Sequence, residues 1–471
     1  MSSLPARARR IALLLALGLA ACAPDEPGEA AVPAAAPAPE AAPPVQRDIL
    51  LLLVDTLRAD HLGLYGYPRA TSRNLDAFAE DALVFEQVLA PAPWTLPSVG
   101  SVMTGVHPSV HGLRAHEGEG MTGLRPALAT LAESLRAAGY RTAAVVTNPW
   151  LKGKTHGLQR GFDEYRVVTG MTAHEVHDEA TPIVRAKDPR PLFLYLHYMG
   201  PHGPYRRHPQ LGHDVLGPLP ERYDRVLGEA ELAALPRYLK LDGARELGAY
   251  VDRYDGAIHA WDEAFGAWME RFARRAPEAQ PIVCVIADHG EEFVEHGGWN
   301  HGETLYAEQL EVPWILRLPG RPPGRIREPV SLIDVAPTLL AAVGVPIPAT
   351  MTGLDVLGRP LDAGRPLFAE NDVRMGGASD PAHRQSSVRI GARERIEHPG
   401  GAECYDLALD PRQAHPGCDD AAWNEALAAE LRAWSEASAR LAESLGSAPA
   451  VELEPGAREE LRALGYAGDD E

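Results

Sequence analysis

The chain has 471 residues, of which 45% are hydrophobic and 23% are charged, and these fractions are ordinary for a soluble globular protein. Its length is sufficient for one large α/β domain with a smaller appendage, or for two or three ordinary domains. The net charge of −20 argues against a nucleic-acid-binding surface, because such surfaces need clustered Lys and Arg. It does not exclude a small anionic substrate, because a bound metal ion can dominate the field inside a cleft.

The first 22 residues have the pattern of an export signal. Arg7, Arg9 and Arg10 precede an apolar run over 11–19 that is too short to span a bilayer. The Leu-Ala-Ala-Cys22 sequence that follows is similar to the bacterial lipobox, in which the Cys is acylated and becomes the new N-terminus. A plain signal peptide without lipid is the alternative interpretation.

Residues 23–47 are rich in Ala, Pro and Glu, and such a segment behaves as a semi-extended spacer because it cannot bury apolar surface. We therefore predict that residues 1–22 are a lipoprotein signal peptide and that residues 23–47 are a tether. The mature protein is expected to be exported to the bacterial cell envelope, on its periplasmic or extracellular face. Its contact with the membrane is expected only through the lipid on Cys22.

The folded part opens with the apolar run 48–55, which ends in a carboxylate and is typical of a buried central strand of a parallel sheet. Strands that alternate with helices indicate an α/β fold with a large, doubly wound, mixed or parallel sheet and helices on both faces. Further strands are expected at 143–146, 191–198 and 281–287, and helices at 74–81, 127–138 and 244–274.

From about residue 366 the pattern changes to short strands, Gly-rich turns and two acidic helices near 421–445 and 457–464. We therefore predict one large domain over 48–365 and a small C-terminal α+β subdomain over 366–471.

Three cysteines follow Cys22. Cys284 lies in an apolar run and is expected to be a buried strand residue. Cys404 and Cys418 lie in the C-terminal part of a chain that is expected to be exported, where disulfides can persist. The sequence leaves open whether these two cysteines are paired.

Polar residues at strand ends are the first candidates for a site, because functional residues of open α/β sheets gather beyond the carboxyl ends of the strands. The expected strands select Asp55, Asn148, His202 and Asp288. With His289, the two carboxylates form a natural site for a divalent cation. Asp55 alone has a structural alternative as a helix or loop cap. Charged groups at the end of a core strand are costly unless they are paired or ligated.

Thr95 is the candidate nucleophile. It precedes an expected helix whose first turn carries Pro97, at a position that proline favours. In a purely structural role, Thr95 would be the N-cap of that helix. In a functional role, its hydroxyl would lie at the positive end of the helix dipole beside a cation, where it could ionise and attack sulfur or phosphorus.

Short motifs along the chain resemble those of the sulfatases, which are members of the alkaline phosphatase superfamily. The matching segments are 55–60 (DTLRAD), 64–68 (LYGYP), 97–98 (PS), 103–105 (MTG), 111–112 (HG), 130–133 (TLAE), 139–140 (GY), 161–163 (GFD), 201–205 (PHGPY), 288–291 (DHGE), 312–313 (VP), 333–340 (IDVAPTLL) and 405–407 (YDL). They cover roughly residues 48–411 in family order. The resemblance implies an alkaline-phosphatase-like fold and a metal-dependent hydrolase of sulfate or phosphate esters, with 48–365 as the catalytic domain.

Carried over residue by residue, the resemblance assigns roles to the candidates. Asp55, Asp288 and His289 fall on metal-ligand positions. Thr95 falls on the nucleophile, which also binds the metal. His202 matches a histidine that contacts the substrate.

Two further positions complete the implied site. His301 lies near the place where many sulfatases use Lys to bind the anion. Asn148 lies close to a Lys-Trp-His segment of the family that is absent here, and is assigned to a non-bridging oxygen of the substrate. His202 or His301 is expected to protonate the leaving group.

The departures from the family pattern concern the nucleophile. The usual signature is Cys or Ser-x-Pro-Ser-Arg, whose first residue is oxidised to formylglycine, whereas this chain has Thr95 and Val99 at the first and last positions. Threonine cannot give that aldehyde by the same oxidation, and the second Asp of the usual pair is Thr56. A conventional formylglycine sulfatase is therefore not expected. Phosphodiesterases and phosphotransferases of the superfamily use a metal-bound Thr, so we expect phosphoryl chemistry ahead of sulfuryl chemistry.

Three functions follow from these features. The first is a hydrolase of a small-molecule or glycan ester, with one divalent ion (Ca²⁺, Mn²⁺ or Zn²⁺) and Thr95 as nucleophile. The second is a phosphoryl or head-group transferase that uses the same Thr intermediate. The third is a catalytically inactive homologue that binds an anionic glycan. Nucleic acid is not an expected partner.

Overall fold

The computed structural model describes residues 47–115, 121–152, 156–170, 172–205, 213–372, 383–417, 420–451, 456 and 459–461. The predicted signal peptide, Cys22 and almost all of the predicted tether lie outside these residues. Residues 44–471 form one compact unit. Within the described ranges, no helix combines the length and the apolar character that a membrane span requires.

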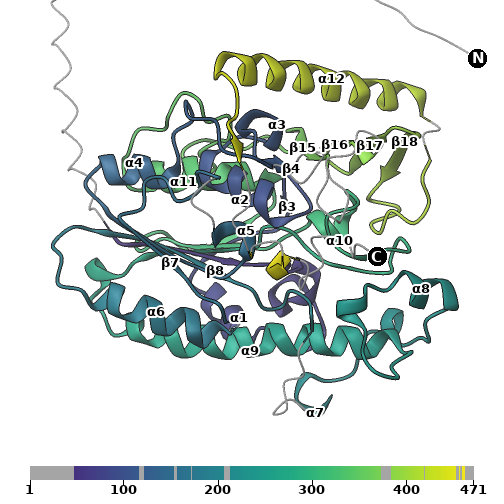
Figure 1. The fold of residues 1–471 in the computed structure, drawn as a ribbon, viewed down its shortest axis with the longest axis horizontal. Coiled ribbons are helices and arrows are strands. Elements are labelled where there is room, and N and C mark those ends of the chain that lie inside the picture. Colours follow the sequence, from purple (N-terminus) through teal and green to yellow (C-terminus); the bar gives the residue numbers. More distant parts are fainter. Residues whose placement is uncertain are drawn as a thin grey trace, which may run out of the picture. The chain divides into compact units, whose positions relative to one another are not determined.

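An eight-stranded mixed sheet forms the centre of this unit (Figure 1). β12 alone runs antiparallel to its two neighbours, and the other pairs in the sheet are parallel. This sheet confirms the predicted fold class. The strands stand in the order β13 (Gly324–Ile326), β2 (Leu83–Phe85), β12 (Trp314–Arg317), β9 (Ile282–Ile286), β1 (Ile49–Val54), β8 (Leu192–Tyr198), β6 (Arg141–Val146) and β7 (Glu164–Val167).

The central strands are apolar because helices cover both faces of the sheet. Every residue of β1, β8 and β9 is buried, so these strands show no alternation of polar and apolar side chains. Leu51 of β1 lies between Tyr195 of β8 and Cys284 of β9 in the register. Cys284 is therefore a buried strand residue, as predicted.

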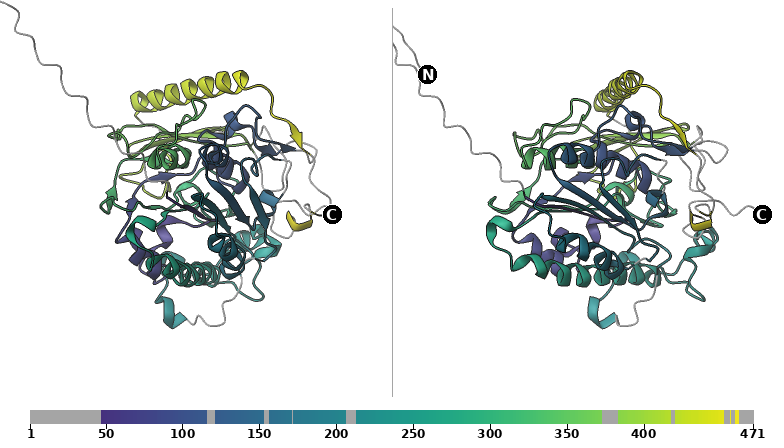
Figure 2. Two further views of the ribbon diagram at one scale, coloured as in Figure 1. Left: turned by 90° about the vertical axis from the view of Figure 1, so that its left-hand side faces the viewer. Right: turned by 60° about the vertical axis from the view of Figure 1, so that its left-hand side comes forward.

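Two layers of helices enclose the sheet, and both views of Figure 2 show the sheet between them. The long helix predicted at 244–274 is present at 247–273, and its buried side includes Tyr254, Ile258, Trp261 and Phe265. One layer contains α1 (Arg73–Ala79), α6 (Ala173–Arg185) and α9 (Leu247–Ala273), and the other contains α2 (Thr95–Thr104), α4 (Leu131–Ala137) and α11 (Val335–Ala342).

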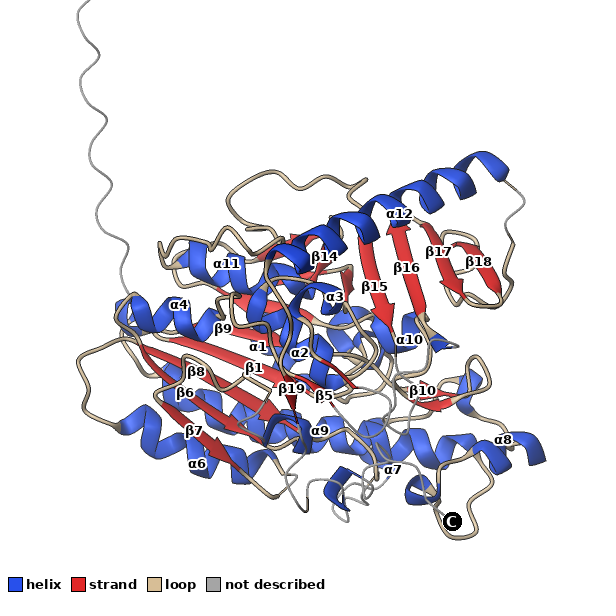
Figure 3. Ribbon diagram, turned by 45° about the horizontal axis from the view of Figure 1, so that its top comes forward, coloured by secondary structure: helices blue, strands red, loops and turns tan. Residues whose placement is uncertain are grey.

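The C-terminal part forms a four-stranded antiparallel sheet with α12 (Ala421–Ser444) lying across it (Figure 3). This arrangement agrees with the predicted short strands and the helix near 421–445. Most of the second predicted helix lies outside the described residues. The boundary between 365 and 366 stays a prediction, since both parts belong to one compact unit. The strands are β15 (Leu367–Asn371), β16 (Gln385–Ile390), β17 (Arg393–His398) and β18 (Gly401–Asp406).

Cys404 is buried in β18 and is disulfide-bonded, and Cys418 lies outside the described residues. Short elements connect the main layers. They are the helices α3 (Pro108–His111), α5 (Pro149–Lys152), α7 (His213–Leu216), α8 (Glu229–Ala234) and α10 (Ala307–Leu310), and the strand groups β3 (Val88–Leu89) with β14 (Val330–Ser331), β10 (Glu292–Phe293) with β11 (Trp299–Asn300), and β4 (Arg114–Ala115) with β5 (Met121–Thr122) and β19 (Ala450–Val451).

Candidate active site

The order of the strands brings the predicted strand-end residues to one edge of the sheet. β9, β1, β8 and β6 are neighbours and run parallel, so their carboxyl ends lie together. Asp288, Asp55, His202 and Asn148 follow these strands in that order, and all four are buried. The edge that was expected to carry the site therefore carries a buried polar cluster.

Asp55 and Asp288 converge with His289 at this edge. One ligand atom of each residue lies within 4.8 Å of the others. The Nε2 atom of His289 is 3.4 Å from Asp55 Oδ1 and 3.6 Å from Asp288 Oδ2. The Nδ1 atom of the same ring donates a hydrogen bond to the carbonyl oxygen of Gly290 at 2.9 Å. Because the proton of the neutral ring is on Nδ1, the lone pair of Nε2 faces the carboxylates.

This set of donors fits a divalent cation. Asp55 Oδ1 and Asp288 Oδ2 are buried and accept no hydrogen bond from any residue that the structure describes. Burial raises the pKa of both carboxyl groups, and the charge of Asp288 raises the pKa of Asp55 further. Positive charge between these groups would remove that penalty. Carboxylate oxygens suit Ca²⁺, whereas the imidazole of His289 favours Mn²⁺ or Zn²⁺, so the residues fit the class of ion without selecting one.

The backbone of the turn after β1 supports Asp288. Thr56, at the position of the second family Asp, has a φ of 57°, which is uncommon for a β-branched residue. The hydroxyl of Tyr254 holds this turn, because it donates to the Thr56 carbonyl at 2.7 Å and accepts from the Arg58 N–H at 2.9 Å. The N–H groups of Thr56 and His289 both donate to Asp288 Oδ1, at 3.4 and 3.0 Å. Thr56 thus supports one ligand through its main chain.

The hydroxyl of Thr95 lies beside this cluster. Helix α2 begins at Thr95 itself, one residue earlier than the sequence indicated. The Thr95 Oγ1 atom is 3.4 Å from His289 Nε2 and accepts a hydrogen bond from Asn148 Nδ2 at 3.2 Å. The Ser98 hydroxyl donates to the carbonyl oxygen of Asp288 at 2.6 Å, and this bond attaches the first turn of α2 to the end of β9.

Asn148 contacts both a carboxylate and the hydroxyl. Its Nδ2 atom donates to Asp55 Oδ2 at 2.7 Å and to Thr95 Oγ1 at 3.2 Å. Its Oδ1 atom accepts from the backbone N–H of Trp150 at 2.9 Å, so the hydrogen-bond network assigns the orientation of the amide. The hydrogen bond from Asn148 lowers the pKa of Asp55, against the effect of burial.

His202 and His301 continue the cluster beyond His289. The ring centroids of His289 and His301 are 4.3 Å apart, and those of His301 and His202 are 4.9 Å apart. Burial lowers the pKa of His202 to about 3 and the pKa of His301 well below its usual value. Both rings are therefore neutral near pH 7 in the free protein. The proton of His301 can be donated to a substrate oxygen, whereas the Nδ1 proton of His202 is donated to the Gly203 carbonyl, so Nε2 of His202 accepts unless the ring gains a second proton.

Sequence reasoning missed two buried residues of this site. His197 Nε2 lies 3.6 Å from Asp55 Oδ2, and its Nδ1 lies 3.2 Å from the Thr147 hydroxyl. Glu291 Oε1 lies 3.3 Å from His301 Nδ1, and burial raises the pKa of Glu291 to about 7. A histidine inside the apolar strand β8 was the available signal for the first. For the second, the signal was its place two residues after His289.

Basic side chains form no ion pair with the carboxylates of this cluster among the described residues, and Arg58 donates to the backbone carbonyl of Glu291 at 2.8 Å. Among the described residues, the carboxylates of Asp55, Asp288 and Glu291 have histidines and no Lys or Arg as ion-pair partners. A cation would therefore be the main positive charge at the site, and the local field without it is negative.

The mixed sheet, with two carboxylates, an imidazole and a helix-terminal hydroxyl at its edge, agrees with the alkaline-phosphatase-like fold that the sequence motifs indicated. Residues 47–345 match the sulfatase family, and this match covers more than half of the chain. The chain belongs to the sulfatase family.

Two curated sulfatases are similar over about two thirds of the chain, and a third is similar over 28% of it. The ulvan-active sulfatase of Formosa agariphila is 24% identical over 357 residues, which are 66% of this chain and 65% of the relative. The human N-acetylgalactosamine-6-sulfatase is 26% identical over 369 residues, which are 69% of this chain and 68% of the relative. The mouse steryl-sulfatase is 33% identical over 148 residues. The chain spans just under two thirds of the first of these relatives and 23% of the mouse protein.

Solved structures share the fold. A phosphonate monoester hydrolase from Silicibacter pomeroyi aligns with a TM-score of 0.67 at 20% identity, over 84% of this chain and 96% of its own. A 2-O GAG sulfatase aligns with the same TM-score at 18% identity, over 90% of this chain and 98% of its own.

Proposed function

We propose that this protein hydrolyses a phosphate or sulfate ester, with Thr95 as the nucleophile and one divalent cation held by Asp55, Asp288 and His289. The observation that carries this proposal is the 3.4 Å distance between Thr95 Oγ1 and His289 Nε2, within a cluster of unsatisfied carboxylate oxygens. This position places the Thr95 hydroxyl beside His289, a proposed metal ligand 194 residues away in the chain.

A bound divalent cation would lower the pKa of the Thr95 hydroxyl and offset the charge of the transferred group. Asn148 holds the Thr95 oxygen in place, and α2 presents it at the positive end of a ten-residue helix. Thr95 Oγ loses its proton to solvent and forms a bond to phosphorus or sulfur while the bond to the alcohol oxygen breaks, and that oxygen leaves with the electron pair. His202 or His301 takes up a proton when the anionic ester binds and donates that proton to the leaving oxygen. Water then attacks the same phosphorus or sulfur atom, and the Thr95 oxygen leaves and regains a proton.

The choice of Thr favours phosphoryl transfer over sulfuryl transfer. A formylglycine hydrate can expel sulfate by elimination, whereas a Thr ester must be cleaved by water at phosphorus or sulfur. Among proteins of this fold, two phosphonate monoester hydrolases are structurally similar to the chain. This similarity supports our proposal that the substrate is a phosphodiester or a phosphonate ester.

The ester belongs, in our proposal, to a small molecule or a glycan. Two structurally similar proteins were solved with D-glucosamine-2-N,6-O-disulfate and with a neocarrahexaose. These ligands were bound by those proteins. They support a glycan ester as the class of substrate for this protein, but they do not identify its sugar.

Two other functions use the same residues. A transferase would pass the group from Thr95 to an alcohol instead of water. An inactive anion-binding protein would retain the fold without turnover. The joint presence of Thr95, both carboxylates and His289 favours an enzyme. In an inactive protein these residues would no longer be needed for catalysis, and at least one of them would be expected to be replaced.

The test is turnover by the purified full-length chain of aryl sulfate, aryl phosphate and aryl phosphodiester esters, each with Ca²⁺, Mn²⁺ or Zn²⁺. We expect the phosphodiester to be cleaved fastest, and Thr95→Ala to lose about a thousandfold or more in kcat. Thr181→Ala, on α6, is the matched threonine control and keeps full turnover.

Other results would select another function. Faster release of the aryl alcohol when a second alcohol is added would indicate a transferase. Absence of turnover with every ester and ion, together with retention of an anionic ligand, would indicate a binding protein.

A further inference from the structure

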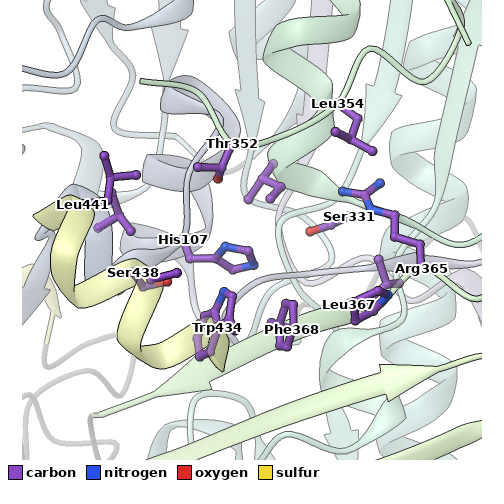
Figure 4. Close-up of a pocket in the computed structure, with 14 residues that line it drawn as sticks. His107, Ser331, Thr352, Leu354, Arg365, Leu367, Phe368, Trp434, Ser438 and Leu441 are labelled. Atoms are coloured by element: carbon purple, nitrogen blue, oxygen red, sulfur yellow. The ribbon is translucent and has the colours of Figure 1, made fainter. Parts of the chain in front are cut away.

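A second cavity lies between α12 and the body of the protein, lined by residues that the proposed reaction does not use (Figure 4). Its volume is about 390 Å³, which is within the usual range of small-molecule sites, roughly 300–1,000 Å³. Five segments contribute to its wall, namely residues 107–110 after α2, residues 331–333, residues 352–354, residues 365–368 and part of α12. The lining residues include His107, Ser331, Arg365, Phe368, Trp434 and Leu441.

The wall of this cavity is mainly apolar and aromatic. The rings of Phe368 and Trp434 stack with centroids 4.8 Å apart and an interplanar angle of 7°. The ring of His107 meets Trp434 edge-on at 5.1 Å. Figure 4 shows these three rings around one side of the cavity, with Leu441 on another side. Such a surface favours a flat, apolar ligand.

Two polar atoms at the cavity lack partners. His107 Nε2 and Ser331 Oγ form no hydrogen bond with any residue that the structure describes, although His107 is 5% exposed and Ser331 is 1% exposed. Buried polar atoms of this kind are normally satisfied by a partner, because an unmade hydrogen bond is costly. Burial lowers the pKa of His107 to about 4, so its ring is neutral near pH 7.

The charge at the cavity is already neutralised. Arg365 donates to Asp334 through Nη1 at 2.6 Å and through Nη2 at 2.9 Å. This bidentate pair satisfies the guanidinium, so it does not call for an anionic ligand. A ligand that fits this wall is therefore uncharged and carries a group that both donates and accepts a hydrogen bond.

We propose that this cavity is a second binding site, separate from the active site, for a neutral phenol or alcohol of one or two rings. The rings of the ligand would pack against Phe368 and Trp434, and its hydroxyl would pair with His107 Nε2 and Ser331 Oγ. A hydroxyl suits both atoms, since it donates one hydrogen bond and accepts others.

The position of the cavity separates it from the chemistry. Thr95 is the first residue of α2, whereas His107 follows the last turn of the same helix. A ten-residue helix is about 15 Å long, so the two sites lie at opposite ends of α2. The binding site does not depend on the reaction proposed above.

The test is calorimetric titration of the full-length protein with 2-naphthol, and with 2-naphthoate as the anionic counterpart. Ala437 lines the cavity from α12, so Ala437→Leu fills part of it. Ala437 and Ala439 are both exposed on this helix, but Ala439 does not line the cavity, so Ala439→Leu is the matched control. We expect Ala437→Leu to weaken binding of 2-naphthol by about tenfold or more and Ser331→Ala by about three- to tenfold, with little change for Ala439→Leu.

Three results would overturn the proposal. The first is the absence of saturable binding of 2-naphthol by the wild-type chain up to its solubility limit. The second is equal binding by Ala437→Leu, when circular dichroism shows that this variant is folded. The third is tighter binding of 2-naphthoate than of 2-naphthol. Thr95→Ala is expected to bind as the wild type does, and a loss of binding in this variant would place the probe in the active site.

Discussion

The Nε2 atom of His289 lies 3.4 Å from the hydroxyl oxygen of Thr95, although the two residues are 194 positions apart in the chain. Both residues are fully buried. Their contact depends on β9 and α2 meeting at one edge of the sheet, and it joins the proposed nucleophile to the proposed metal site. Substitutions in the metal site or near the nucleophile can therefore be tested by measuring ion binding, turnover and stability.

Removing one carboxylate should raise the unfolding temperature without the ion and lower it with the ion. In EDTA, we expect Asp288→Asn to unfold at a higher temperature than the wild type, because it relieves the repulsion between Asp55 and Asp288. With Mn²⁺ the order should reverse, because the wild type gains about 2.7 kcal/mol at a hundredfold excess of ion over Kd. Thermal unfolding with and without Mn²⁺ measures both effects, and the exposed Asp242→Asn is the control.

The pH dependence of that comparison has a defined sign. The folded-state pKa values of Asp55 and Asp288 lie above their unfolded values, so these groups stabilise the metal-free fold most at low pH. Their contribution falls as the pH rises from about 4. The advantage of Asp288→Asn in EDTA should therefore grow between pH 4 and pH 7. An advantage that is constant with pH would contradict the assignment.

Loss of the Asn148 amide should slow turnover more than it weakens ion binding. Its Nδ2 atom bonds both Thr95 and Asp55, but Asn148 is not itself one of the proposed ligands. We expect Asn148→Ala to lower kcat by about 10- to 100-fold while it still binds the ion. Steady-state kinetics and ion titration measure the two effects. Asn424→Ala, in α12, is the control, and an unchanged kcat in Asn148→Ala would remove Asn148 from the site.

His296 should stabilise the fold in acid and lose that effect in base. Its Nδ1 lies 2.6 Å from Glu308 Oε1 and its Nε2 lies 3.0 Å from the Gln413 carbonyl, so both ring nitrogens donate and the ring is protonated. These contacts raise the pKa of His296 to about 9, and burial opposes them. Because the folded pKa is the higher one, the stabilisation is complete below about pH 6.5 and disappears as the pH rises through 9.

The corresponding variant is His296→Gln. We expect it to lose about 1–3 kcal/mol of unfolding free energy at pH 6, with a much smaller loss at pH 9.5. Denaturant unfolding at the two pH values measures this difference. His398→Gln, on β17, is the control, and an equal loss at both pH values would show that packing rather than charge is responsible.

The lipid anchor is open to a direct test. If Cys22 is acylated, the full-length protein expressed in a bacterium takes up labelled palmitate and enters the detergent phase after Triton X-114 separation. Cys22→Ser should lose both properties, whereas Cys284→Ser should keep them. Label in the Cys22→Ser protein would favour another mode of attachment. Absence of label from both the wild type and the Cys22→Ser protein would favour a plain signal peptide.

The sequence predicted those parts of the fold in which a run of apolar residues forms a fully buried element. The apolar runs of β1 and β9 have no polar face, so both their strand character and their central place could be read directly. The strand-end rule then selected Asp55 and Asp288. Two-residue pairings such as β10 with β11 could not be predicted, because no periodicity exists over so short a length.

The rest of the site depends on tertiary packing. His197 and Glu291 belong to it only because the sheet and the following loops bring them beside Asp55 and His301. The cavity under α12 had no sequence signal for a similar reason, since its wall combines residues from five separate segments. The start of α2 was misplaced by one residue because Thr95 resembles an N-cap, whereas that place belongs to Trp94.

The 2.6 Å bond from the Ser98 hydroxyl to the Asp288 carbonyl has a dynamic consequence. It makes the reactive helix end and the ligand-bearing strand end move as one body, so neither can shift without breaking a fully buried contact. Amide hydrogens around this bond should then exchange only through global unfolding. Substrate entry would have to rely on movement of the outer loops, while the centre keeps its arrangement.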